Sequence, residues 1–321
     1  MQNAASYLRS KSLDELNMRQ TILRLELNTR GQRWRTFLGT SIRKLLPRFR
    51  LQAHLASLFG RSVKISVLGK MLNMDLRDGA LSSTLYANGV WEPEETSFVD
   101  KTLQPGMVFV DVGANIGYYT IIASELVGPS GRVFAFEPDP GNFVFLQKNI
   151  DANDCANVVA SQKAVAASSQ SLRLYRSENN FGDHRIYEPK DESLYKQKRK
   201  RLAIDIDAIS LDDYFTLNST HVDFLKMDIQ GAEYEAFIGM RKLLAQNPDI
   251  TILTEFWPKG LGQAGVSAEV FLDEVRSSGF KIYLLDHGKS HEVSNSEILG
   301  GLSDDAYVSL VLSRKNFGHT S

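Results

Sequence analysis

Cysteine is nearly absent from this chain, because Cys155 is the only one among 321 residues. A single thiol excludes an intramolecular disulfide framework and a metal site built from cysteines alone. No apolar run approaches the roughly 20 residues that a membrane-spanning helix needs. The first residues also lack the apolar segment of a signal peptide. We therefore expect a protein of the reducing cytoplasm.

Acidic residues are scarce at the start of the chain. Residues 1–64 hold 13 Lys and Arg but 3 Asp and Glu, which leaves 24 basic and 35 acidic residues for the remainder. A basic segment can meet nucleic acid, an anionic membrane or an acidic polymer, or it can pack on the acidic body. It offers few aromatic side chains for stacking on bases, so we expect no nucleic-acid partner. We favour short helices packed on the body, with peripheral membrane contact as the alternative.

The rest of the composition is that of a globular protein, with 43% hydrophobic and 23% charged residues. The length allows about two domains. Val63, Ile65 and Val67 alternate before a glycine, which predicts a small β-hairpin over residues 62–78. We therefore divide the chain into a basic helical arm with this hairpin, residues 1–80, and an α/β domain, residues 81–321.

Residues 106–138 are the most informative stretch, because they read as strand, glycine turn, helix and strand. Residues 108–112 (VFVDV) are too apolar to be half exposed, which is typical of a central parallel strand. Gly113 and Gly117 bracket the turn, where a missing Cβ lets a ligand lie against the backbone. Glu137 closes the second strand about 20 residues later, where dinucleotide folds bind a ribose diol. The stretch therefore predicts a nucleotide-type site.

The turn lacks the G-x-G-x-x-G pattern of dehydrogenases, since Asn115 and Tyr118 occupy its second and third glycine positions. Asp111 stands two residues before the first glycine, at the predicted end of the strand. A carboxylate there repels a pyrophosphate but suits an ammonium or sulfonium group. These features argue against an NAD-dependent oxidoreductase. They favour S-adenosylmethionine, which carries both cations and a ribose for Glu137.

Several further motifs surround this stretch. VDVGANIGYYT begins at residue 110 and VFAFEPDPGN at residue 133, GVWEPEETSF precedes them at 89–98, and SLDDYF and VDFLKMDIQGAEYE follow at 210–215 and 222–235. In this order they resemble the FkbM-type methyltransferases, a branch of the class I S-adenosylmethionine-dependent enzymes, over roughly residues 85 to 290. The resemblance implies a hydroxyl acceptor on a sugar, glycan or polyketide-type molecule. It also implies Glu92 and Thr96 as cofactor contacts.

The remaining apolar segments predict the sheet. They include a third strand over residues 157–166 and one helix over residues 231–246. The last two strands, residues 280–285 and 307–313, are joined by a long polar loop. Such a final antiparallel pair distinguishes the seven-stranded methyltransferase sheet from an all-parallel one. We therefore predict an α/β fold with a seven-stranded, mostly parallel sheet and helices on both faces.

The predicted parallel strands end in four acidic residues, which are Asp111, Glu137, Asp228 and Glu255. Ligands of an open α/β sheet bind outside the carboxyl ends of its strands, so we expect a charged cleft there. We assign Glu137 to the ribose hydroxyls. The residues that we assign to the methionine end of the cofactor are Gly113, Ala114, Asn115 and Gly117, with Asp111 near its ammonium. The resemblance implies that Ala164, near the end of the third strand, contacts the adenine.

Methyl transfer is an in-line displacement at an activated sulfonium, so the protein mainly brings the acceptor oxygen to about 3 Å from the methyl carbon. A hydroxyl must also lose its proton, and Asp228 is our first candidate base and Glu255 our second. His184 is a third candidate, within a polar insertion, residues 177–200, that we interpret as an acceptor-binding loop. We expect no metal, because Gln230 and not an acid follows Asp228 by two residues. A non-catalytic cofactor-binding scaffold is the alternative outside the enzymes.

Overall fold

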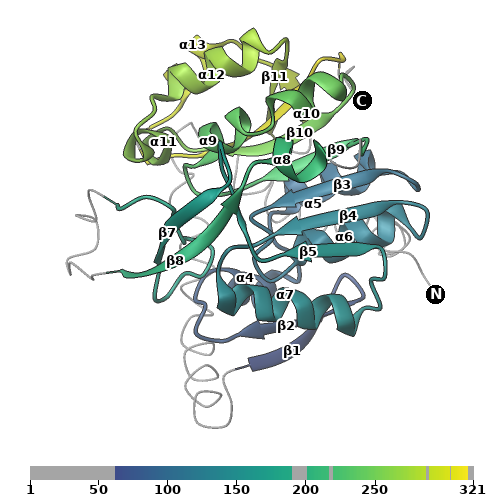
Figure 1. Cartoon of the computed structure of the whole chain (residues 1–321). Helices are drawn as coiled ribbons and strands as arrows, with labels where there is room; N and C mark the ends of the chain where they lie inside the picture. Colours follow the sequence, from purple (N-terminus) through teal and green to yellow (C-terminus); the bar gives the residue numbers. More distant parts are fainter. Residues whose placement is uncertain (1–61, 190–200, 217–219, 287–288, 304, 317–321) are drawn as a thin grey trace, which may run out of the picture.

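A computed structural model describes residues 62–189, 201–216, 220–286, 289–303 and 305–316 (Figure 1). The predicted helices of the basic arm fall on residues 1–61, outside this part of the chain. Their packing and the alternative of membrane contact therefore stay predictions, as does the division at residue 80. In the described part, no helix is long and apolar enough to cross a membrane.

The molecule is built around one large sheet of eight strands (Figure 1). In spatial order they are β12 (Lys289–Glu292), β11 (Lys281–Asp286), β13 (Val308–Ser313), β10 (Thr251–Phe256), β9 (Phe224–Met227), β3 (Val108–Val112), β4 (Arg132–Phe136) and β5 (Val158–Ser161). The strands from β10 to β5 run parallel, whereas β13 lies antiparallel between β10 and β11. The mostly parallel sheet with an antiparallel strand near its end is confirmed.

The predicted number of seven strands is wrong by one, because β12 adds an edge strand. It forms a hairpin with β11, in which Asp286 pairs with Lys289. Its sequence KSHE is polar and short, and one of its four residues is half-buried while three are exposed. Such an edge strand carries no apolar alternation, so the sequence pattern reads as loop.

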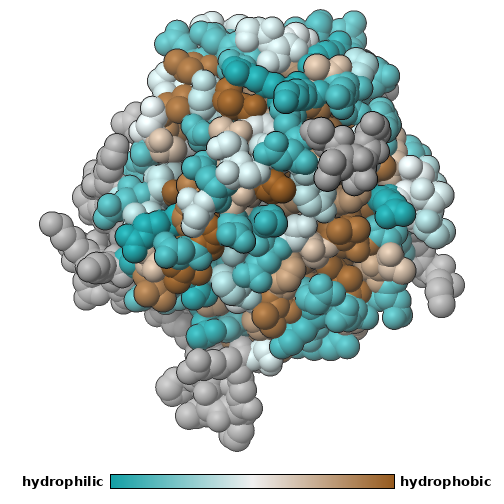
Figure 2. Space-filling view, in the orientation of Figure 1, coloured by the Kyte–Doolittle hydropathy of each residue, from teal (hydrophilic) through white to brown (hydrophobic). Residues whose placement is uncertain are grey.

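Both faces of the large sheet are covered, which explains why its central strands are apolar throughout. Along β3, Val110 and Val112 belong to the core on one face, and Phe109 belongs to the core on the other. The helices on the Phe109 face are α4 (Leu81–Asn88), α5 (Pro93–Thr102), α6 (Tyr118–Val127) and α7 (Pro140–Ala152). Those on the Val110 face are α8 (Leu211–Thr216), α9 (Glu233–Ile238), α10 (Arg241–Gln246), α11 (Pro258–Ala264), α12 (Ala268–Ser277) and α13 (Asn295–Gly301). On the side of the molecule in Figure 2, hydrophobic residues lie in small groups separated by hydrophilic ones.

Two predicted elements are each divided in the structure. The third strand stops at Ser161, where the N–H of Lys163 donates to the Ser161 carbonyl, and the chain then joins a second sheet as β6 (Ala164–Val165). The helix predicted over residues 231–246 breaks between α9 and α10 at Gly239. A Cβ at Gly239 would lie 2.0 Å from the Ala166 carbonyl oxygen, so the chain from β6 passes directly over this point. Apolar periodicity in the sequence indicates neither the end of the strand at Ser161 nor the close approach at Gly239.

The second sheet has three strands, in the order β6, β8 (Leu202–Ile209) and β7 (Gln170–Arg176). β7 and β8 extend beside the large sheet, at the left of Figure 1. A separate hairpin, β1 (Ser62–Val67) and β2 (Lys70–Asp75), turns through Leu68 and Gly69, which both have positive φ. The predicted hairpin is thereby confirmed, and its second strand contacts α7.

Candidate active site

The glycine turn between β3 and α6 lies in direct contact with the end of β9. Gly113 has φ +84°, and a Cβ there would lie 2.1 Å from the backbone oxygen of Asp228. The N–H groups of Gly113 and Ala114 both donate to the Phe136 carbonyl, which fixes the turn to the end of β4. At Gly117, with φ +89°, a Cβ would meet Leu146 of α7 at 2.7 Å. Gly113 is therefore required by its contact with backbone, and Gly117 is favoured by its positive φ, whatever lies on the turn.

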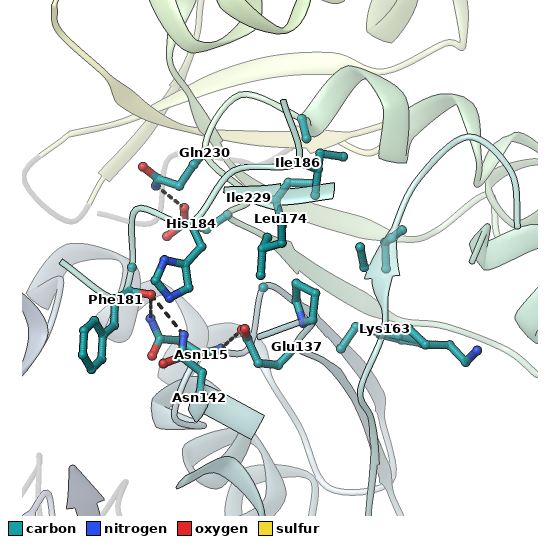
Figure 3. A pocket seen from close by; sticks show the side chains of 18 residues that line it. Asn115, Glu137, Asn142, Lys163, Leu174, Phe181, His184, Ile186, Ile229 and Gln230 are labelled. Carbon is teal, nitrogen blue, oxygen red and sulfur yellow. Dashed lines mark hydrogen bonds between the residues drawn. The ribbon is translucent and has the colours of Figure 1, made fainter. Parts of the chain in front are cut away.

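A cavity of about 530 Å³, open to solvent, lies between this turn and the second sheet (Figure 3). Six residues that the sequence singled out line it, and they are Gly113, Asn115, Glu137, Ala164, His184 and Asp228. Its apolar wall comes from Phe136, Val165, Leu174, Ile186 and Ile229. Ala114 and Gly117 lie in the turn, and Glu255 lines a second, neighbouring cavity. The described part of the predicted insertion, residues 177–189, contributes Phe181, Gly182, His184 and Ile186 to the first cavity.

Glu137 stands at the end of β4, buried, with its carboxylate held by backbone N–H groups. Oε2 accepts from the N–H of Asn115 at 2.8 Å, and Oε1 accepts from the N–H of Asp139 at 2.9 Å. Burial raises the pKa of Glu137 to about 8, although these hydrogen bonds lower it. Each oxygen accepts one backbone N–H and has a further acceptor site when the group is ionised, so hydroxyl donors from a ligand would bind there and would favour the ionised form.

Asn115 has an acceptor atom that the protein leaves unpaired. Its Nδ2 donates to the Phe181 carbonyl at 3.4 Å, and Asn142 donates to the same oxygen at 3.0 Å (Figure 3). Its Oδ1 is buried and has no hydrogen-bond partner among the residues that the structure describes. A buried carbonyl oxygen without a donor is costly, so a ligand N–H group would stabilise it. In Figure 3 the Lys163 side chain extends away from the other labelled residues.

The His184 side chain is positioned by contacts with neighbouring groups of the protein. Its Nδ1 accepts from the Ser177 N–H at 3.0 Å, and its Nε2 lies 3.8 Å from Oδ2 of Asp139. Burial lowers the pKa of His184 to about 4, with the Asp139 carboxylate opposing this shift. The imidazole is therefore neutral near pH 7, and the lone pair on Nδ1 is engaged.

Asp111 lies one residue before the end of β3 and not at its tip. Its side chain is on the Phe109 face, 2% exposed, and Oδ2 accepts from the Thr120 hydroxyl at 2.6 Å. It lines neither of the two cavities. Thr96 is also buried and bonded within the protein, with its hydroxyl donating to the Trp91 carbonyl at 2.7 Å. The roles assigned to Asp111 and Thr96 stay predictions, and any contact of Asp111 with a ligand would need a bridging group.

The two candidate bases are linked by a residue that sequence reasoning did not assign to the site. Gln230, with φ +56°, donates from Nε2 to Oδ1 of Asp228 at 2.9 Å and to Oε2 of Glu255 at 3.1 Å. Burial raises the pKa of Glu255 well above its ordinary value, and the Asp228 carboxylate raises it further. Glu255 therefore holds its proton to a higher pH than an exposed glutamate does.

Lys226 was also missed, although strand periodicity places it on the same face as Asp228 two residues later. Its Nζ lies 3.6 Å from Oδ2 of Asp228, 4.0 Å from Oε2 of Glu92 and 4.4 Å from the centre of the Tyr119 ring. Burial alone would lower the pKa of Lys226, but the Asp228, Glu92 and Asp111 carboxylates more than offset this and raise it. Lys226 is therefore a permanent cation beneath the candidate bases.

A mostly parallel sheet with an antiparallel strand near one end, and acids at the carboxyl ends of its strands, is the fold expected of a class I methyltransferase. The chain belongs to the FkbM methyltransferase family, since the model of the methyltransferase FkbM domain matches residues 111–282. Members of this family use S-adenosylmethionine as their cofactor, as the sequence predicted.

Curated relatives agree with this family. The chain is 26% identical over 143 residues to methyltransferase 1 of Beauveria bassiana (strain ARSEF 2860), which covers 41% of the chain and 57% of that protein. It is 28% identical over 154 residues to methyltransferase sdnD of Sordaria araneosa, covering 41% and 59%. The match thus spans less than two thirds of either relative. A solved FkbM methyltransferase from Methylobacillus flagellatus KT has a TM-score of 0.39 and 17% identity, covering 85% of this chain and 60% of that one.

Proposed function

We propose that the chain is an O-methyltransferase that methylates a hydroxyl of a sugar, glycan or polyketide-type acceptor. The observation that carries this proposal is that Asp228 forms part of the wall of both cavities. One cavity offers a ribose site, and the other is lined with proton-accepting carboxylates. Donor and acceptor groups bound in the two cavities would meet at Asp228.

The first cavity fits S-adenosylmethionine, which supplies an activated methyl group when bound. Glu137 would accept from the two ribose hydroxyls, and the unpaired Oδ1 of Asn115 would accept from the ammonium. Ala164 and its apolar neighbours would contact the adenine, while the turn from Gly113 to Gly117 would present its backbone to the methionine end. The described residues of the wall include two acids, no arginine and one lysine, Lys163, whose side chain extends away from the other labelled residues (Figure 3), which disfavours the pyrophosphate of NAD.

Asp228 is the favoured base, because it lies where the cavities meet, with the ammonium of Lys226 3.6 Å from its Oδ2. It would take the proton from the acceptor hydroxyl as the oxygen attacks the methyl carbon. Glu255 is the second candidate, since its raised pKa makes it the stronger base when it is ionised. His184, with its lone pair engaged by Ser177, would orient the segment around Phe181 instead.

Product analysis tests this function with an acceptor that is still to be identified. Purified protein is incubated with a host metabolite extract and S-adenosylmethionine that carries a deuterated methyl group, and labelled products are identified by mass spectrometry. We expect a labelled methyl ether, which Asp228→Asn reduces by about a hundredfold or more while affinity for S-adenosylhomocysteine stays within a few fold. Turnover by Asp228→Asn at the wild-type rate would remove Asp228 from the mechanism. A labelled amine would replace O-methylation by N-methylation, and no labelled product would favour the scaffold.

A further inference from the structure

The second cavity lies at the carboxyl ends of β9 and β10, beside the start of α5 and of β13. It holds about 280 Å³ of empty space, counted together with the solvent at its mouth, and shares Asp228 with the first cavity. Three further acids, Glu92, Glu95 and Glu255, complete its charged lining, and Lys226 is the single basic residue among the described residues that line it. Four carboxylates thus face one ammonium group.

The positive charge of Lys226 is already engaged within the protein. Its side chain is 8% exposed, and its Nζ lies between the carboxylates of Asp228 and Glu92. It therefore offers little to an anion in the cavity. Within the described part of the chain, neither Glu255 nor Glu95 forms an ion pair with a basic side chain, so acids outnumber bases in this lining. Burial raises the pKa of Glu92 to about 7 and raises the pKa of Glu255, so the surplus of negative charge grows as the pH rises above neutral.

The protein's hydrogen-bond donors at this site also point at the carboxylates and not at the open space. The Tyr119 hydroxyl donates to Glu92 at 2.8 Å, and the Ser309 hydroxyl donates to Glu95 at 2.5 Å. The Gln230 amide donates hydrogen bonds to Asp228 and Glu255. Since each carboxyl group can accept several hydrogen bonds, acceptor capacity remains here, while the side-chain donors left in the described lining are the Tyr307 hydroxyl and the Lys226 ammonium. A ligand that brings donors therefore suits this lining best.

We propose that the second cavity is the acceptor subsite and that it selects acceptors whose reacting part carries hydroxyl or amine donors and no negative charge. Hydroxylated rings and amino sugars have this chemistry, whereas phosphorylated or carboxylated groups would face a lining in which four acids outnumber one base. The inference rests on the proposed function, because it takes the first cavity as the site of the methyl donor.

The charge preference can be measured before the acceptor is identified, by placing a thiol in the cavity. Ser309→Cys is nearly isosteric and is made in a Cys155→Ser background, so that the chain keeps one thiol. Its rates of reaction are compared with a cationic trimethylammonium-ethyl and an anionic sulfonato-ethyl methanethiosulfonate. Each reagent forms a mixed disulfide with the thiolate and releases methanesulfinate. Val144→Cys in the same background is the reference, since Val144 is 51% exposed on α7, away from the cavity.

The ratio of cationic to anionic rates should be at least about tenfold larger for Ser309→Cys than for Val144→Cys, because acids in a cleft concentrate cations and exclude anions. Adding Glu255→Gln to Ser309→Cys should lower that ratio several fold above neutral pH, where Glu255 ionises despite its raised pKa. Saturating S-adenosylhomocysteine should leave the Ser309→Cys rates within about twofold, since it occupies the first cavity. Tyr307→Cys, at an exposed position of the same lining, is the second site if Ser309→Cys does not fold.

Equal ratios at the cavity and reference positions would overturn the charge selection. Loss of labelling on addition of S-adenosylhomocysteine would assign the second cavity to the methyl donor and would overturn the acceptor subsite. A failure of the proposed function is distinguishable, because S-adenosylhomocysteine would then not bind the wild-type protein at all, whereas the charge ratio is measured without it.

Discussion

Gly113 is the residue at which the cofactor turn and the candidate base come into contact. Its positive φ and its approach to the Asp228 backbone leave no room for a side chain. Any substitution must move the turn away from β9, and with it Asn115, whose N–H holds Glu137. One position therefore controls both the packing and the geometry of the site.

We predict that Gly113→Ala costs more than about 2 kcal/mol of unfolding free energy and weakens S-adenosylhomocysteine binding by tenfold or more, since strain and a backbone clash combine. The matched control is Gly89→Ala. Gly89 is also left-handed, with φ +69°, but a Cβ there meets nothing within 4 Å, so it should cost about 1 kcal/mol and leave binding unchanged. Thermal unfolding and titration calorimetry measure both variants. Equal losses of stability with intact binding would refute the role of this contact.

At the residue scale, the sequence predicts where a side chain lies only as well as it predicts where the strand beside it ends. Glu137 follows β4 directly, so its place at the edge was readable from the pattern. Asp111 was expected at a tip, but β3 continues through Val112, and a strand that is one residue longer places that carboxylate under α6. Gln230, which donates to Asp228 and Glu255, has a left-handed backbone. The apolar periodicity of the sequence does not indicate such a backbone conformation.

Among the elements, α7 connects the N-terminal hairpin to the cofactor turn. Asn149 on α7 accepts from the Asn73 N–H at 2.6 Å and donates to the Asn73 carbonyl at 3.0 Å. Its Nδ2 also donates to the Ile116 carbonyl in the glycine turn at 2.7 Å. One buried amide therefore joins three segments that are distant in sequence.

Asn149→Ala should destabilise the protein by about 2–3 kcal/mol, because it leaves buried backbone groups of the hairpin and turn without partners. Gln147→Ala on the same helix is the control. Gln147 is exposed and bonds the neighbouring turn of α7 through Asp151, so its loss should stay within about 0.5 kcal/mol. Urea unfolding compares the two. If Asn149→Ala behaved like Gln147→Ala, the hairpin would not be coupled to the cofactor turn.

At the element scale, long apolar segments were predictable and short or polar ones were not. β3, α6 and β4 follow the expected pattern because each buries apolar residues at its own period. The third strand changes sheets within one apolar run, and β12 is polar. α13 begins with a capping box of Ser294 and Glu297, a signal that was present in the sequence but lay within the expected polar loop.

On the scale of the whole molecule, the sheet brings two cavities together at Asp228. The first holds a buried carboxylate and an unpaired amide oxygen, and the second holds a surplus of acids. These charges support our proposal of a cationic cofactor and a donor-rich acceptor, and they disfavour an anionic dinucleotide. Acceptor identity depends on details of the second cavity, which motif spacing did not indicate.

Thermal unfolding with S-adenosylhomocysteine, S-adenosylmethionine or NAD⁺ in separate samples tests the central claim most directly. At about a hundred times its dissociation constant, a ligand adds about 2.7 kcal/mol, which raises Tm by about 5–10 °C in a domain of this size. We predict this shift for both adenosyl ligands, no shift for NAD⁺, and loss of the effect in Glu137→Ala. Stabilisation by NAD⁺ alone would contradict the account and favour hydride chemistry, and no shift with any ligand would contradict cofactor binding altogether.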